Sequence, residues 1–364
     1  MKERVVVAMS GGVDSSTTAA LLKKEGYDVV GVYIIGWLGT PDFPCPWQSE
    51  ESDARKVAEQ LDIPFYSINL SDEYKKEVVD SFIEGYRKGI TPNPDVLCNK
   101  EIKFKALWEA IRQFEPDYLA TGHYAKISNT GTDKATIYKG DDPDKDQSYF
   151  LWAINKNILP KVMFPIGDLK KTEVRKLAKE YKLPTADKKD SQGICFIGKL
   201  DVKEFLGKYI DDKSGDAILL DGRVIAKHKG VRFYTIGQRL ASGSVDWTGD
   251  VPPLFVIAKD IENNRIIVGP DSKTNSSYFK VKDLNWLAET KDEFDCLVKI
   301  RYRQEDVAAK VKNTGTNLEV TLNESVRAVT VGQSAVFYTK DGQMLGGGII
   351  SEIPEQDEIV KKTR

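Results

Sequence analysis

The sequence predicts an α/β protein with three parts: an N-terminal domain built on a parallel sheet, a small mixed middle domain and a C-terminal β-barrel. Strand and helix signals alternate through the first 120 residues, as in parallel β-α-β units covered by helices on both faces. From Ala217 on, the predicted strands are short and separated by Gly, Asn and Asp. The chain has 364 residues, too many for one compact core, so two or three domains are expected.

The first strand and helix illustrate the N-terminal pattern. Val5–Met9 is a continuous apolar run, typical of a strand buried on both faces, and the helix Ser15–Glu25 ends where Gly26 can cap it. The further strands expected are Asp28–Ile35, Pro64–Leu70 and Tyr118–Thr121, and the further helices cover residues 54–61, 74–86 and 102–114. Ligands of such sheets bind beyond the carboxyl ends of the strands.

The predicted boundaries divide the chain into residues 1–199, 200–280 and 281–354, followed by a charged tail, 355–364, that is expected to fray. Asp221-Gly222 and Asp341-Gly342 indicate hairpins in the second and third parts. Barrel strands are expected at Cys296–Tyr302, Leu318–Leu322 and Ala335–Thr339.

Composition limits the class of protein. Apolar content of 41% and charged content of 30% are typical of a soluble globular protein. The apolar run Val5–Ala8 meets glycines at once, so it predicts neither a signal peptide nor a membrane span, and a cytoplasmic location is expected. The net charge of −2 means that any nucleic acid would bind local basic patches.

The histidines and cysteines narrow the chemistry. Two histidines, His123 and His228, give poor support for a His-rich metal site or a Ser-His-Asp triad. The four cysteines form no Cys-x-x-Cys pair, and in a reducing cytosol they are thiols. Covalent chemistry is therefore expected to use Cys, Asp or Lys.

The run Ser10-Gly11-Gly12-Val13-Asp14-Ser15-Ser16 lies between a predicted strand and a helix start. Its glycines let the backbone approach an anion, and a helix N-terminus favours negative charge, so pyrophosphate is the expected ligand. Asp14 would repel phosphate unless magnesium lay between them. A serine-capped helix after a glycine turn is the simpler alternative. The whole run resembles the PP-loop of the ATP pyrophosphatases, which adenylate a carbonyl oxygen and release pyrophosphate; in that family adenine lies near the second strand, here around Ile34.

Two cysteines lie in polar, loop-like contexts. Cys98 follows Asn93-Pro94-Asp95, and if it begins the next helix its thiol pKa should be lowered. Cys195 follows Lys188 and Lys189, which could stabilise a thiolate. Any single cysteine is more often a small buried apolar residue, and this interpretation is kept for Cys296 and favoured for Cys45.

Several segments in order resemble the tRNA-specific 2-thiouridylases of the MnmA/TrmU type, from residue 5 to about 350. The matching segments are Ser10–Ser16, Thr91–Asn99, Ala120–Tyr124, Asp144–Leu151, Lys189–Gly198, Phe233–Arg239, Arg301–Gln304 and Leu345–Gly348.

The resemblance implies a role for each of a set of residues. Those implied to bind ATP are Ala8, Met9, Ser10, Gly11, Gly12, Val13, Asp14, Ser15, Ile34 and Gly122. Those implied to contact the target base are Asn93, Pro94 and Asp95, and those implied to touch tRNA are His123, Lys145, Asp146, Gln147, Arg301, Tyr302 and Gln333. Cys98 would be the nucleophile and Cys195 would carry a persulfide.

The implied reaction is 2-thiolation of the wobble uridine of tRNA. ATP, with Mg²⁺, would adenylate the C2 carbonyl of uracil, and persulfide sulfur from Cys195 would replace AMP. Cys98 would free that sulfur by forming a Cys98–Cys195 disulfide, with Asp95 as acid or base. A cysteine desulfurase or a sulfur-relay protein would reload Cys195, and no membrane is involved.

Other hypotheses remain open. The segment Gly36–Trp47 departs from the family pattern near the adenine pocket. An iron–sulfur cluster on Cys98, Cys195 and a third ligand is a rival to the persulfide. The chain could instead adenylate a small molecule and add nitrogen, as argininosuccinate synthetase does, or be a non-catalytic RNA- or sulfur-carrying protein; the two cysteines and the intact loop argue against both.

Three basic clusters suggest a tRNA surface, although each alone is more often a solvated charged face. The clusters are Lys170, Lys171, Arg175, Lys176, Lys179 and Lys182; Arg223, Lys227, Lys229, Arg232 and Arg239; and Lys299, Arg301 and Arg303.

Overall fold

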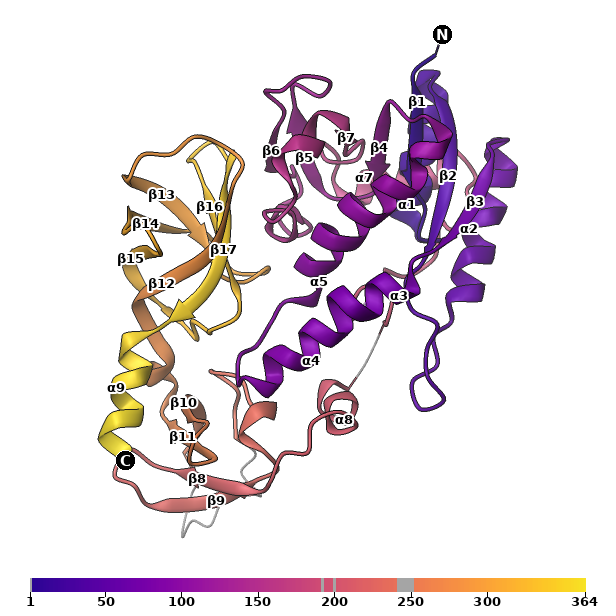
Figure 1. The fold of residues 1–364 in the computed structure, drawn as a ribbon. Coiled ribbons are helices and arrows are strands. Elements are labelled where there is room, and N and C mark those ends of the chain that lie inside the picture. The colour runs from indigo at the N-terminus through magenta and orange to yellow at the C-terminus, as the bar shows by residue number, and fades with distance from the viewer. Residues whose placement is uncertain (1, 191–192, 199–200, 241–251) are drawn as a thin grey trace.

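A computed structural model describes residues 2–190, 193–198, 201–240 and 252–364. In Figure 1 a layered α/β domain lies beside a closed barrel, and a small β domain lies below both. The fold class predicted from the sequence is confirmed. In the described part of the chain, no helix has the length and apolar composition needed to cross a membrane.

The N-terminal domain is built on a parallel sheet of five strands in the order β3-β2-β1-β4-β7. The strands are β1 (Arg4–Ala8), β2 (Asp28–Ile35), β3 (Phe65–Asn69), β4 (Tyr118–Thr121) and β7 (Val162–Met163). Val5, Val6 and Val7 of the central strand are fully buried because helices cover both faces, which explains the unbroken apolar run.

Alternation along β1 assigns each face to its helices. Val5 and Val7 pack in the core under α1 (Val13–Glu25), α2 (Trp47–Leu61) and α7 (Lys171–Glu180). Val6 points to the opposite core, which is covered by two composite helices. The first comprises α3 (Ser71–Tyr74), the π-helix η1 (Lys75–Val79) and α4 (Asp80–Arg87); the second comprises α5 (Pro94–Leu97), the π-helix η2 (Cys98–Ala106) and α6 (Leu107–Ile111). In Figure 1 these two helices run from the sheet towards the middle domain.

The middle domain contains a mixed sheet in the order β10-β11-β8-β9. Its elements are α8 (Val202–Gly207), β8 (Gly215–Ile218), β9 (Val224–His228), β10 (Phe255–Asp260) and β11 (Arg265–Gly269). The hairpin predicted at Asp221-Gly222 is confirmed, since it joins β8 to β9 with Gly222 at φ 84°.

The C-terminal domain is a closed antiparallel barrel in the order β12-β15-β14-β13-β16-β17. Its strands are β12 (Asn275–Trp286), β13 (Glu293–Lys299), β14 (Val307–Asn313), β15 (Leu318–Arg327), β16 (Ser334–Tyr338) and β17 (Met344–Glu352). The second predicted hairpin, Asp341-Gly342, joins β16 to β17 and is confirmed. Cys296 lies in the barrel core as expected.

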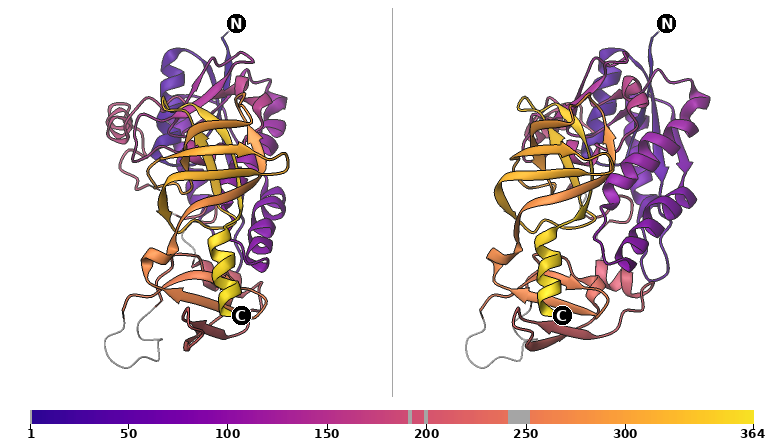
Figure 2. Two further views of the ribbon diagram at one scale, coloured as in Figure 1. Left: turned by 90° about the vertical axis from the view of Figure 1, so that its left-hand side faces the viewer. Right: turned by 60° about the vertical axis from the view of Figure 1, so that its left-hand side comes forward.

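The barrel is joined to the N-terminal domain by backbone and side-chain contacts. A hairpin of β5 (Ala125–Ser128) and β6 (Thr136–Lys139) meets the β16–β17 turn, where the N–H of Lys139 donates to the carbonyl of Gly342 at 3.1 Å. Asn285 of β12 donates to the carbonyl oxygens of Trp152 and Ile154. Two views from other sides place the barrel alongside the N-terminal domain (Figure 2).

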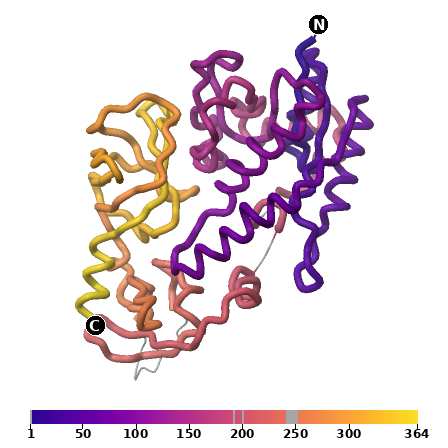
Figure 3. Tube along the Cα trace, in the orientation of Figure 1, coloured from indigo at the N-terminus to yellow at the C-terminus, as the bar shows by residue number. Residues whose placement is uncertain are grey.

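The expectation of a frayed tail is wrong, because residues 354–363 form the helix α9 (Pro354–Thr363). Ile359 and Val360 pack against the middle-domain sheet, and the guanidinium of Arg364 lies 2.8 Å from the buried carboxylate of Asp260. The tube in Figure 3 shows this helix leading from the barrel down to the middle domain. The sequence did not predict this helix because most of its residues are polar or charged, and only Ile359 and Val360 supply apolar contacts to the sheet.

Candidate functional site

The glycine loop after β1 has a backbone that only glycine permits. Gly11 has φ +72°, and a Cβ there would lie 2.2 Å from the carbonyl oxygen of Glu50. Gly12 caps α1 in an extended conformation without a side-chain hydrogen bond. The first N–H groups of α1 therefore remain available to an anion, and the helix dipole favours one there.

A second glycine completes this edge of the sheet. β1 lies between β2 and β4, so the strand order reverses here, and ligands of open α/β sheets bind at such a point. Gly122 directly follows β4, and a Cβ on it would lie 2.7 Å from the backbone nitrogen of Ser15. The structure thus brings together the loop Ser10–Ser15 and Gly122, as predicted from the resemblance. Ile34 is buried in the core at the carboxyl end of β2.

A chain of charged side chains surrounds the loop. Lys171, at the start of α7, places its Nζ 2.7 and 2.8 Å from the two carboxylate oxygens of Asp14 and 2.9 Å from Asp190. Tyr124 donates to Asp14 at 2.8 Å. Burial raises the pKa of Asp190, but hydrogen bonds from Lys145 and Lys171 outweigh burial and hold that pKa well below its ordinary value.

The magnesium expected beside Asp14 does not match these contacts. Both carboxylate oxygens of Asp14 already accept hydrogen bonds from the Lys171 ammonium, which supplies the positive charge that magnesium was expected to bring. Among the residues described, no group of three or more His, Cys, Asp or Glu is arranged to hold a metal ion. In this arrangement the carboxylate of Asp14 is paired with Lys171.

The position of Cys98 differs from the one expected. Asn93 caps the composite helix, accepting hydrogen bonds from the N–H groups of Asp95 and Val96, and the helix begins at Pro94. Cys98 lies one turn further on and is fully buried. Its thiol pKa is raised by burial, so the lowered pKa expected for a helix N-terminus is wrong for Cys98.

Cys195 lies against the same helix. Its backbone N–H donates to the Oδ1 of Asp95 at 3.1 Å, and its carbonyl accepts a hydrogen bond from the Tyr74 hydroxyl. The ring of Phe196 stands against Tyr74, with ring centres 5.4 Å apart, and covers Gly36. The segment Ile194–Phe196 is thus tied to both composite helices.

The two sulfur atoms affect each other's ionisation. The thiol of Cys98 is hydrogen bonded to the sulfur of Cys195, and this bond, followed by the nearby charge of Lys103, lowers the Cys195 pKa to about 7 despite burial. Cys195 is therefore the better thiolate at neutral pH and Cys98 the proton donor. Lys188 does not stabilise Cys195 as suggested, because its Nζ contacts the carbonyl of Gly11 and the carboxylate of Asp53.

The remaining cysteines do not complete a cluster. Cys45 is closer to the site than the sequence suggested, since its thiol donates to the carbonyl of Phe196 at 3.2 Å. Cys296 is in the barrel. All four cysteines are free, and no metal-holding group of three side chains occurs within the described ranges, so these residues do not fit an iron–sulfur cluster.

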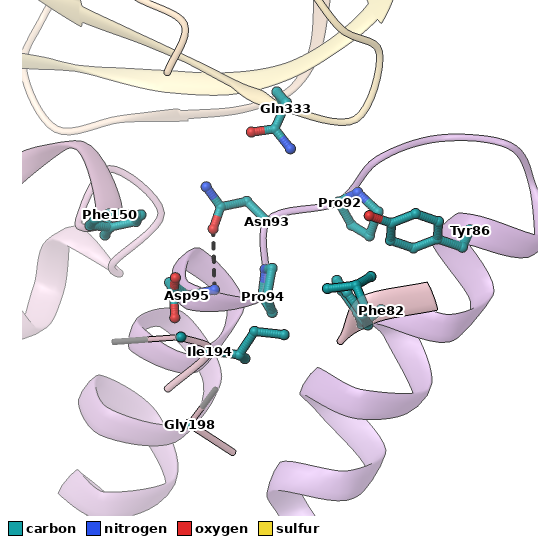
Figure 4. Close-up of a pocket in the computed structure, with 12 residues that line it drawn as sticks. Phe82, Tyr86, Pro92, Asn93, Pro94, Asp95, Phe150, Ile194, Gly198 and Gln333 are labelled. Carbon is teal, nitrogen blue, oxygen red and sulfur yellow. Dashed lines mark hydrogen bonds between the residues drawn. The ribbon is translucent and has the colours of Figure 1, made fainter. Parts of the chain in front are cut away.

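A cavity of about 370 Å³ opens beside the cysteine pair. Asn93, Pro94 and Asp95 lie on one side of it, Ile194 on another, and Gln333 reaches it from the barrel (Figure 4). Phe82, Tyr86 and Phe150 supply aromatic surface. Burial raises the pKa of Asp95, against the opposing effects of the Cys195 N–H and Lys103, so its carboxyl is shifted towards the protonated form. A flat polar ring beside an acid and a thiolate suits this cavity.

The residues expected to touch tRNA fall into two groups. Gln333 lines the cavity and donates to the carbonyl of Thr91, and the Tyr302 ring packs against Phe150 at a tilt of 41°, with ring centres 4.6 Å apart. His123 and Asp146 are buried and bonded within the protein. Lys145 binds Asp190, the Gln147 side chain accepts from the N–H of Tyr124, and Arg301 donates to the carbonyl of Ala328.

Lys299 does not form part of the tRNA surface suggested for its basic cluster, because it is buried beside Asp146. Sequence patterns missed Lys103, Lys171 and Tyr74, which meet the site from three different helices. The sequence indicated Lys171 only as a member of a basic cluster, at a position where a helix begins.

A glycine loop at a strand-order reversal, in one domain with a buried cysteine pair near a cavity, is the arrangement of an ATP-dependent thiol enzyme of the PP-loop type. Family models agree with this class along the chain: one described as "tRNA methyl transferase HUP domain" matches residues 3–199, a "tRNA methyl transferase PRC-barrel domain" matches 203–270, and an "Aminomethyltransferase beta-barrel domain" matches 276–350.

Three curated relatives that match nearly the whole chain are each named tRNA-specific 2-thiouridylase MnmA. The tRNA-specific 2-thiouridylase MnmA of Oceanobacillus iheyensis is 45% identical over 97% of this chain and 96% of that protein. Those of Streptococcus thermophilus and Bacillus subtilis are 46% and 45% identical, over 98% and 96% of this chain and 98% and 95% of theirs. The chain belongs to the tRNA-specific 2-thiouridylase family, and the resemblance inferred from its motifs is confirmed.

Proposed function

We propose that this protein is a tRNA-uridine 2-sulfurtransferase that uses ATP to replace the C2 oxygen of the wobble uridine with sulfur. The observation that carries the proposal is the Cys98–Cys195 pair, which is joined through the Cys195 N–H to Asp95, a residue that lines the cavity. Family membership supplies the substrate class, tRNA, and the cytoplasm is the compartment in which such a substrate is met.

In the first step the uracil O2 attacks the α-phosphorus of ATP, and pyrophosphate leaves. The loop Ser10–Ser15 and the start of α1 hold the phosphates, while Lys171 and Lys188 supply positive charge near the loop. Mg²⁺ bound together with ATP would add positive charge beside the phosphates.

In the second step Cys195 carries a persulfide whose terminal sulfur attacks C2, and the adenylated oxygen leaves as AMP. Cys98 then attacks the inner sulfur, which is Sγ of Cys195. The S–S bond breaks, its electron pair stays on the sulfur bound to C2, and a Cys98–Cys195 disulfide forms. Asp95 exchanges protons with the ring. A thiol reductant restores the pair, and a cysteine desulfurase or a sulfur-relay protein reloads Cys195.

One experiment tests this function. Purified protein is mixed with ATP, a persulfide donor and unmodified tRNA, and nucleosides and AMP are measured by mass spectrometry. We expect one 2-thiouridine for each AMP, with no product from Cys98→Ala or Cys195→Ala, and Cys296→Ala as the control that retains activity. Thiolation by Cys195→Ala would overturn the persulfide assignment, and a methylated nucleoside formed with a methyl donor would favour the chemistry named in the family models.

Proposals also follow for the site and the domain boundaries. We propose that the ATP residues are those of the loop together with Ile34 and Gly122. We also propose that Asn93, Pro94 and Asp95 meet the base, and that Gln333, Tyr302 and Arg301 lie nearest to the bound tRNA. We propose three domains in which the barrel begins with β12 (Asn275–Trp286), because the boundary expected between residues 280 and 281 would divide that strand. The boundary expected between residues 199 and 200 lies outside the described residues.

A further inference from the structure

Lys103 is a half-buried lysine five residues beyond Cys98 on the same composite helix. In a regular α-helix, residues five apart point about 140° away from each other around the axis. The segment Cys98–Ala106 is instead a π-helix, whose backbone bonds join residues five apart, so Lys103 lies above Cys98 on one face. The wider helix therefore brings a cation to the cysteine pair.

Lys103 has a fixed set of partners. Its ammonium is hydrogen bonded to the sulfur of Cys195 and lies 3.4 Å from the Nε2 of His123. Because an ammonium has no lone pair, Nε2 must be the acceptor, and the His123 proton is on Nδ1. Nδ1 lies 2.7 Å from the hydroxyl oxygen of Thr121, at the end of β4. Burial and the charge of Lys103 lower the pKa of His123 well below its ordinary value, so the ring is neutral.

We propose that Lys103 is a further catalytic residue, which holds the anionic sulfur of Cys195, and that Thr121 and His123 position its ammonium. The role of Lys103 at the thiolate of Cys195 is independent of the proposed function. Its role at a persulfide on Cys195 rests on that function. His123 thus gains a role inside the protein in place of the tRNA contact expected for it.

The charges around Cys195 show why a cation is needed. The titratable groups around it, besides Lys103, are Asp95 and Cys98 from the same composite helix, Tyr74 from the neighbouring one, and Cys45, whose thiol donates to the carbonyl of the next residue, Phe196; His123 lies behind Lys103. Of these, Asp95 is acidic and the others are neutral at pH 7. Without Lys103 a half-buried thiolate would face a carboxyl group with no counter-charge, which disfavours its ionised form.

The geometry also connects the two halves of the reaction. Thr121 and His123 flank Gly122, which packs against Ser15 of the phosphate loop. The three residues that end and follow β4 thus contact both the glycine loop, through Gly122, and the Lys103 ammonium, through His123.

The test measures alkylation of Cys195 by iodoacetamide as a function of pH, with each cysteine followed by peptide mass spectrometry and without ATP or tRNA. In the unaltered protein we expect a midpoint near pH 7 for Cys195. In Lys103→Met the midpoint should rise by about one unit or more, which lowers the alkylation rate at pH 7 about fivefold. Lys103→Arg, which keeps the charge, should restore part of the rate.

Lys105→Met is the matched control. Lys105 lies two residues further along the same helix, is exposed and pairs with Glu101, so its loss should leave the Cys195 midpoint unchanged. If Lys103→Met is poorly folded, Lys103→Gln and His123→Asn provide the same comparison, with circular dichroism spectra and thermal unfolding as checks on the fold. We expect His123→Asn to raise the pH midpoint of Cys195 alkylation by less than Lys103→Met does.

An unchanged Cys195 midpoint in folded Lys103→Met or Lys103→Gln would overturn this inference, whatever the enzyme does with tRNA. Absence of tRNA thiolation by the unaltered protein would overturn the proposed function and leave the midpoint shift intact. The two failures are therefore distinguishable.

Discussion

The backbone N–H of Cys195 donates a hydrogen bond of 3.1 Å to Oδ1 of Asp95. This bond joins two segments that are 100 residues apart in sequence and sets the thiolate beside the acid that faces the cavity. Asp95 therefore has two separable tasks, to hold the loop of Cys195 and to exchange protons.

Two substitutions at Asp95 separate these tasks. Asp95→Asn keeps an acceptor for the Cys195 N–H but cannot titrate, so thiolation should fall about 10²- to 10⁴-fold while the cysteine pair stays in place. Asp95→Ala should lose activity and also slow formation of the Cys98–Cys195 disulfide by a mild oxidant. Both rates can be measured by mass spectrometry, and full activity of Asp95→Asn would exclude a proton-transfer role.

The hydrogen bond from Cys98 is the first cause of the low Cys195 pKa, so its removal should raise that pKa. Cys98→Ala stabilises the thiolate less than the thiol donor does, and we expect the alkylation midpoint of Cys195 to move up from about 7 by about one unit. Cys98→Ser retains an O–H donor and should keep the midpoint close to that of the parent. Equal midpoints for the alanine and serine variants would contradict the assigned donor.

Lys171 should matter for ATP through Asp14. Lys171→Met leaves the Asp14 carboxylate without its cation beside the phosphates, and hydrogen bonds to charged groups are worth about 1.5–3 kcal/mol. We expect ATP affinity to fall about ten- to a hundredfold in equilibrium titrations. Lys176→Met is the matched control, because Lys176 is exposed on the same helix. Equal loss in both variants would indicate a general charge effect.

Gly11 should tolerate no side chain. Its positive φ and the 2.2 Å approach to the Glu50 carbonyl predict that Gly11→Ala abolishes ATP binding and lowers the unfolding temperature. Gly222→Ala has a similar φ, +84°, but nothing within 4 Å of the added Cβ, so it should cost only about 1 kcal/mol and leave ATP binding intact. Normal ATP binding by Gly11→Ala would refute the steric argument.

The C-terminal helix should stabilise the middle domain in a pH-dependent way. Asp260 is buried, and although burial raises its pKa, hydrogen bonds from Arg364 and Asn263 lower it overall. A carboxyl with a lowered folded-state pKa adds stability above its unfolded pKa, and this stability is lost as the pH falls through the folded value.

Arg364→Ala should therefore speed amide exchange in β10 about tenfold at pH 7, and the difference should shrink below about pH 4. Lys362→Ala is the control, because Lys362 is exposed on the same helix and forms a solvent-exposed ion pair with Glu358, one turn away. A difference that persists at low pH would show that packing, and not the ion pair, carries the effect.

Much of the fold follows from local patterns. The apolar run at Val5–Val7 predicts a strand buried on both faces, and the structure covers it with helices on both sides. Asp341-Gly342 predicts a hairpin because that dipeptide suits the required backbone. The tail was misjudged because a helix with few apolar residues gives a weak signal, and its docking partner, Asp260, lies 104 residues away.

The candidate site also has some features that local sequence patterns predict and others that depend on contacts between distant segments. By itself the sequence determined the phosphate loop, the two cysteines and Asp95, since each depends on residue types at short spacing. Only the tertiary structure decided which sulfur carries the charge, because that depends on a hydrogen bond between distant segments and on Lys103. It also placed Lys171 at Asp14 across 157 residues, and it turned His123 inward. A pKa or an ion pair is a property of neighbours in space, which no local pattern specifies.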